Sequence, residues 1–152
     1  MRAMPDRTPR LVLDTNVALD LFVFRDAGCA RLWSALQAGT VQAVVDDVCR
    51  EEWLAVLGYP ALALPEDVQC EAGAAFDQWI QRLSESSLSL PRDARLPRCA
   101  DPDDQKFLEL ALAAGARWLL SKDKAVLQLA RRTAREGWFE ILTPSAWVPP
   151  VT

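Results

Sequence analysis

The chain has 152 residues, of which 51% are apolar and 25% are charged, and its formal net charge is -4. This composition is typical of a globular protein, and the length predicts a single domain, 1–152, with a buried core. The sequence contains no histidine, which excludes Ser-His-Asp and Cys-His catalysis, HExxH zinc sites and histidine general bases. Hydrolysis by this chain would therefore depend on carboxylates, lysines or metal ions.

The expected elements alternate between short apolar runs and helical patterns. In chain order they are a strand at 11–14, helices at 17–24 and 29–36, a strand at 41–45, helices at 47–57 and 66–83, a polar connector at 84–99, a helix at 101–116, a strand at 118–120, a helix at 124–135 and a strand at 139–142. This alternation predicts an α/β fold in three layers, with a mostly parallel central sheet sandwiched by helices.

Location and redox state follow from the same composition. The opening "MRAMPDRTPR" is not followed by the apolar core of a signal peptide, and no charge-free stretch is long enough to span a bilayer. The four cysteines are widely spaced and form no CxxC pair. We therefore expect a cytoplasmic protein with reduced thiols and no membrane association.

Four acidic residues are predicted to meet at one edge of this sheet. Asp14 ends the first strand, and Asp123 follows "WLLSK" at the end of another, so both should lie where parallel strands end. At about 100° per residue, Glu52 falls inside the apolar arc of its helix, where no basic partner is evident. Asp104 falls inside the apolar arc of the helix at 101–116. A carboxylate in such a position is costly unless it is paired or coordinated.

Each acid also has a local interpretation. Asp14 can close a strand and cap a helix, Asp123 can cap the helix that follows it, and Asp101 with Asp104 can form a reciprocal cap around Pro102. These local roles do not explain why four carboxylates would converge, because converging carboxylates repel and raise one another's pKa values. The simplest way to compensate their charge is a hard divalent cation that prefers oxygen ligands, Mg²⁺ or Mn²⁺. Such ions support attack of water on a phosphodiester.

The segments "VLDTNVALD", "CREEWLAVLGYP", "DPDDQKFLELALAAGARWLLSKDKAVL" and "FEILTPSAW" together resemble the PIN-domain nucleases, over residues 11 to about 147 and in the family's order. The match is closest to the branch of toxins from bacterial type II toxin–antitoxin pairs. The resemblance implies a Mg²⁺- or Mn²⁺-dependent endoribonuclease with one or two ions. It places the family's acidic quartet on Asp14, Glu52, Asp104 and Asp123, its polar residue on Asn16 and its hydroxyl on Ser121, where many relatives have Thr.

The net charge of -4 argues against RNA binding by the metal-free protein, but two divalent ions would neutralise it. Candidate RNA contacts are Lys122, Lys124, Arg131, Arg132, Arg135, Arg92, Arg95 and Arg98. Five tryptophans are expected in the core or at interfaces rather than stacked on bases: Trp33, Trp53, Trp79, Trp118 and Trp147. The expected protein partners are an antitoxin and a second copy in a homodimer, and the apolar "YPALALP" at 59–65 is a candidate surface for either.

Two other functions remain open at this point. Asp14 could be the nucleophile of an aspartyl-phosphate-forming phosphatase, although such sites place a second Asp where this chain has Asn16 and a Thr where it has Ala18. The chain could also be a non-catalytic protein-binding module that keeps the fold. A scaffold, however, needs no carboxylates on apolar helix faces.

Overall fold

The computed structural model describes residues 8–90 and 95–150. The predicted RNA contact Arg92 lies outside these ranges. Within them, no helix is long and apolar enough to cross a membrane.

Five parallel strands form one sheet in the order β3-β2-β1-β4-β5. They are β1 (Arg10–Leu13), β2 (Gln42–Val45), β3 (Ile80–Arg82), β4 (Trp118–Leu120) and β5 (Glu140–Leu142). The central strand β1 pairs on one side with β2, where Leu11 is opposite Ala43, and on the other with β4, where Leu11 is opposite Trp118. The carboxyl ends of β1 and β4 therefore meet at one edge of the sheet, as the sequence predicts.

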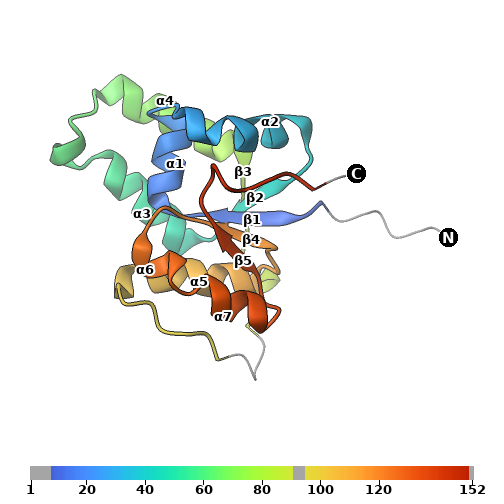
Figure 1. Cartoon of the computed structure of the whole chain (residues 1–152). Coiled ribbons are helices and arrows are strands. Elements are labelled where there is room, and N and C mark those ends of the chain that lie inside the picture. Colours follow the sequence, from blue (N-terminus) through green and yellow to red (C-terminus); the bar gives the residue numbers. More distant parts are fainter. Residues whose placement is uncertain (1–7, 91–94, 151–152) are drawn as a thin grey trace.

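Helices cover both faces of this sheet. The α-helices are α1 (Thr15–Phe22), α2 (Ala30–Ala38), α3 (Asp47–Leu57), α4 (Glu66–Trp79), α5 (Gln105–Ala113), α6 (Lys124–Leu127) and α7 (Ala130–Arg135), with short 3-10 turns η1 (Ala27–Cys29), η2 (Pro60–Leu62), η3 (Glu85–Ser87) and η4 (Pro102–Asp104). Figure 1 shows α1, α2 and α4 on one side of the strands and α5 and α7 on the other. This is the predicted three-layer α/β/α arrangement, with a sheet that is parallel throughout.

Two predicted helices are interrupted in the structure, and the helix expected at 101–116 is the 3-10 turn η4 followed by α5. The helix expected at 66–83 ends at Trp79, and Ile80 begins the edge strand β3 beside Ala43. Phe76, Ile80 and Leu83 are all buried at a spacing that also suits a helix, so periodicity alone did not reveal the change. The helix expected at 124–135 is divided into α6 and α7 by a tightened turn, in which the Leu129 N–H donates to the carbonyl of Val126.

The tryptophan prediction is confirmed for Trp53, Trp118 and Trp147, which are buried in the core, while Trp33 and Trp79 are partly buried and pack against it. Trp53 stacks on Phe76 with ring centroids 4.9 Å apart, and Trp118 meets Trp147 edge to face at 5.4 Å. Trp147 is fully buried, so the segment after β5 contributes to the same core as the strands. The contact with Trp147 therefore anchors the start of β4, at Trp118.

Candidate active site

Asp14 both caps a helix and lies at the sheet edge, so its two sequence interpretations are compatible. Its backbone N–H donates to Leu120 O at 3.1 Å, which extends the pairing of β1 with β4. Its Oδ1 accepts from Val17 N at 2.9 Å and caps α1, and its Oδ2 accepts a short hydrogen bond from the Ser121 hydroxyl. The residue is only 3% exposed, which makes its charge expensive.

Ser121 connects Asp14 to Asp123. Its buried Oγ donates to Asp14 and accepts from the backbone N–H of Asp123 at 3.0 Å. The Oδ1 of Asp123 caps α6 through Ala125 N at 2.8 Å. One hydroxyl therefore fixes the carboxylate after β1 relative to the backbone after β4.

Asp104 and Asp123 approach each other, and Asp101 joins them. One carboxylate oxygen from each of the three lies within 4.8 Å of the other two. Asp104 ends η4 rather than lying inside the helix, and its side chain makes no capping bond. The predicted reciprocal cap is therefore half right, since Asp101 Oδ1 accepts from Asp103 N at 3.0 Å. Sequence reasoning treated Asp101 only as a cap, and its proximity to Asp123 became visible only in the fold.

Two of these carboxyls have raised pKa values. Burial raises the pKa of Asp14 to about 6, and the charge of Asp123 adds to the shift, while bonds from Ser121 and Val17 oppose it. Burial, followed by the charges of Asp123 and Asp101, raises the pKa of Asp104 to about 7. Desolvation and like charges are the two causes expected where carboxylates converge without a cation.

Glu52, on α3, has partners that the sequence did not reveal. Its Oε1 lies 2.5 Å from Lys106 Nζ, and its Oε2 accepts a short hydrogen bond from the Thr15 hydroxyl. The expectation that no basic residue would meet Glu52 is therefore wrong. Lys106 lies on α5, and its long side chain reaches across to Glu52 on α3. Val48, one turn before Glu52, is 59% exposed, so the arc of α3 that contains Glu52 is not buried throughout.

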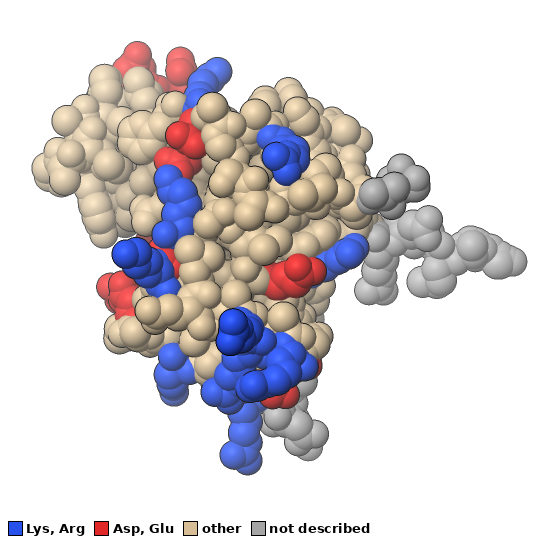
Figure 2. Space-filling view, in the orientation of Figure 1, with Lys and Arg blue, Asp and Glu red and all other residues tan. Residues whose placement is uncertain are grey.

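Of the remaining predicted residues, Asn16 and Lys122 lie beside the acidic centre formed by Asp14, Glu52, Asp101, Asp104 and Asp123. Asn16 is exposed and shares a cleft of about 410 Å³ with Phe24, Lys122 and Asp123. Lys122 forms an ion pair with Asp20. Lys124 and Arg131 are exposed, and Figure 2 shows basic side chains gathered over the lower part of the molecule, where Figure 1 places α7. Arg131, Arg132 and Arg135 are the basic residues of that helix.

A family model described as "PIN domain" matches residues 10–125, which is most of the chain and includes all four predicted acids. The chain belongs to the PIN-domain family. No curated protein matches it. PIN domains are generally metal-dependent nucleases, so the acidic centre of this PIN domain lies in a fold associated with cleavage of nucleic acid.

The carboxylates of this PIN domain fit a hard divalent cation. Asp104 Oδ2 is buried and has no hydrogen-bond partner among the described residues, and a buried polar atom of this kind ordinarily has one. It lies in a cluster whose donors are all carboxylate oxygens, which is the ligand type that Mg²⁺ and Mn²⁺ prefer. Asp101, Asp104 and Asp123 can thus hold an ion, with Asp14 and Glu52 on neighbouring elements.

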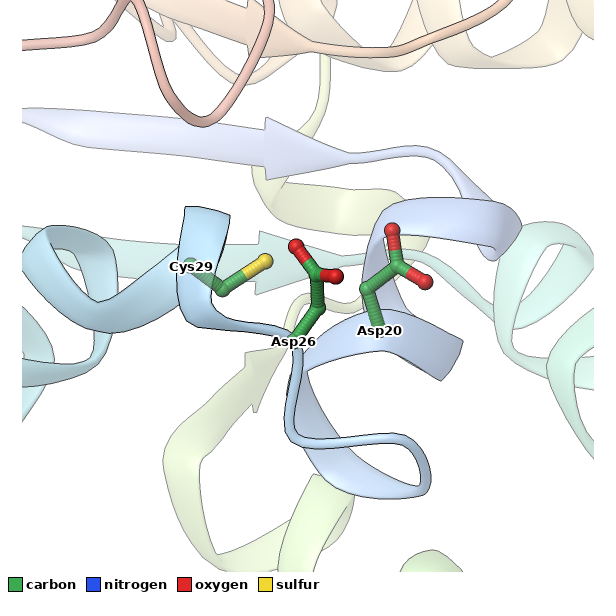
Figure 3. Close-up of side chains that lie close together, drawn as sticks. All are labelled: Asp20, Asp26 and Cys29. Carbon is green, nitrogen blue, oxygen red and sulfur yellow. The ribbon is translucent and has the colours of Figure 1, made fainter.

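A second cluster consists of Asp20, Asp26 and Cys29 (Figure 3), and its Asp20 lines the same cleft as Asn16 and Asp123. Its charged groups already have partners. Asp20 pairs with Lys122, and Asp26 Oδ2 accepts from Gly28 N at 2.9 Å. Burial, followed by the charges of the two acids, raises the pKa of the Cys29 thiol to about 11, so the thiol is protonated in the metal-free protein. These three residues are better explained as a capped and paired turn.

Proposed function

We propose that this PIN domain is a metal-dependent endoribonuclease that acts as the toxin of a type II toxin–antitoxin pair. One observation supports a metal-dependent activity best. Asp104 lies in a cluster with the carboxylates of Asp101 and Asp123, and its buried Oδ2 has no hydrogen-bond partner among the described residues. Three carboxylates this close together repel one another unless a cation compensates their charge. The preference for RNA and the toxin role are supported by the sequence motifs shared with the toxin branch.

In this proposal Asp14, Glu52, Asp104 and Asp123 are the catalytic residues and hold one or two Mg²⁺ or Mn²⁺ ions, with Asp101 as an additional candidate ligand. A bound divalent cation activates water and offsets the charge that develops on the phosphate. Hydrolysis adds water across one P–O bond and leaves two RNA ends. No histidine is needed as a base.

The other predicted residues have supporting roles. Ser121 orients Asp14 through its hydroxyl and holds the backbone of Asp123. Asn16 lines the cleft that also contains Asp123, where it can donate to a substrate oxygen. Lys122, Lys124 and Arg131 would attract the phosphates on either side of the cleaved bond.

The test compares RNA and DNA of one sequence, end-labelled and incubated with Mn²⁺, Mg²⁺ or EDTA. We expect internal cleavage of RNA with either metal and none with EDTA. Asp104→Asn should lower the rate by roughly two orders of magnitude or more. Asp103→Asn is the matched control, because it makes the same change at the adjacent exposed residue and should cleave normally. If Asp104→Asn cleaved RNA as fast as the wild type, the assignment of Asp104 to the active site would be wrong.

The rival functions give different results in the same experiment. Release of phosphate from an aryl phosphate, with a trapped phosphoenzyme and intact RNA, would identify the phosphatase. Intact RNA without a rise in melting temperature on adding Mn²⁺ would identify a non-catalytic module. The toxin role is tested by inducing expression in bacteria. Growth should stop with the wild-type protein, continue with Asp104→Asn and resume when the product of the adjacent upstream gene is co-expressed.

A further inference from the structure

Lys106 extends from the first turn of α5 into the acidic centre. Its Nζ lies 2.5 Å from Glu52 Oε1 and donates to the backbone carbonyl of Asp103 at 2.5 Å. The Lys106 side chain is 22% exposed and the Glu52 side chain 26% exposed, so the ion pair is partly buried. A partly buried ion pair with a second hydrogen bond is held more firmly than an ordinary surface pair.

The second carboxylate oxygen of Glu52 is also engaged. Oε2 accepts from the Thr15 hydroxyl, so both oxygens of Glu52 have donors from the protein itself. At the other end of the centre, Asp104 belongs to the cluster with Asp101 and Asp123, and its buried Oδ2 has no hydrogen-bond partner in the part of the chain that the structure describes. The acidic centre is therefore unequal, since its Glu52 end already has a cation and its Asp104 end does not.

A metal ion and the Lys106 ammonium compete for the same oxygen. An ammonium 2.5 Å from Oε1 occupies one of the positions from which that oxygen could coordinate a cation. The two positive charges also repel each other at short range. The Lys106 ammonium therefore opposes ligation of a divalent ion through Oε1, and binding of the ion favours its displacement.

We propose that Lys106 is a built-in competitor for the metal, which occupies Glu52 in the metal-free protein and is displaced from it when a divalent ion binds. This inference rests on the proposed function, because it takes the acidic centre to be a metal site. Lys106 is then a positioning residue. It keeps Glu52 in place without metal and weakens the affinity for the ion, so that it sets the metal concentration at which the site fills.

The test measures Mn²⁺ binding by titration, with the electron paramagnetic resonance signal of free Mn²⁺ as the readout, so it does not depend on RNA cleavage. Lys106→Met removes the ammonium and keeps most of the side-chain length. We expect Lys106→Met to bind Mn²⁺ about tenfold more tightly than the wild type, the factor that corresponds to one charge-assisted hydrogen bond. Lys124→Met is the matched control, because it removes a positive charge adjacent to Asp123 from an exposed position. It should change the affinity about twofold or less.

A second pair of variants tests whether the effect passes through Glu52. In a Glu52→Gln background the carboxylate is gone, so Lys106→Met should change the affinity no more than Lys124→Met does. A full tenfold gain in that background would mean that Lys106 acts by long-range charge alone, and would overturn the inference.

The outcomes separate this inference from the proposed function. If the wild type and Lys106→Met bind Mn²⁺ equally, or if Lys106→Met binds more weakly, Lys106 is not a competitor, and the nuclease proposal is unaffected. If neither protein binds Mn²⁺ at millimolar concentration, both the inference and the metal-dependent function are wrong.

Discussion

Asp14→Asn separates the two roles of Asp14, the helix cap and the ionised acid. Asparagine keeps the Oδ1 that accepts from Val17 N, so the cap remains. It removes the charge, which is costly because the side chain is 3% exposed. The substitution should therefore stabilise the metal-free protein at a pH where wild-type Asp14 is ionised.

The magnitude follows from the pKa of Asp14, which rises from 3.8 to about 6 on folding. A shift of about two units corresponds to about 3 kcal/mol of unfolding free energy. Because the folded-state pKa is the higher one, the neutral acid stabilises the fold below pH 3.8, and this contribution is lost as the pH rises through about 6. Between pH 4 and pH 8 the wild type should lose about 2–3 kcal/mol that Asp14→Asn does not lose.

The assay is urea or thermal unfolding of both proteins in EDTA from pH 4 to pH 8. The difference in unfolding free energy between them should change by this amount in favour of Asp14→Asn. This corresponds to roughly 5–10 °C in Tm for a protein of this size. A constant difference across the pH range, with Asp14→Asn the less stable protein throughout, would show that Asp14 is only a cap and would refute the reasoning.

Three further predictions test the metal centre and the core. The Mn²⁺ affinity should rise from pH 5 and level off only near pH 8, because metal ligation needs ionised carboxylates and the pKa of Asp104 is raised to about 7; a flat calorimetric profile would contradict this. Ser121→Ala should raise the pKa of Asp14 further and move the midpoint of metal binding to higher pH, and Ser121→Thr should restore it; identical midpoints for all three proteins would exclude the bridging role. Trp147→Ala should lower the unfolding free energy by about 3–5 kcal/mol, because Trp147 is fully buried against Trp118; a loss below about 1 kcal/mol by urea unfolding would count against this packing.

Local patterns predicted much of the fold. The helix expected at 47–57 and the strand expected at 118–120 have the same bounds in the structure, because their bounding turn residues and apolar periodicity are local signals. The edge strand β3 was missed because its local signal is ambiguous. Its apolar spacing suits a helix as well as a strand, and its pairing with β2 depends on residues far away in the sequence.

The sequence by itself determined that the carboxylates after β1 and β4 share an edge, because parallel strands point the same way. It could not determine how those charges are partnered. The contacts of Lys106 with Glu52 and of Asp101 with Asp123 join separate elements. They depend on the distance between packed helices and on the reach of long side chains, which only the tertiary structure sets.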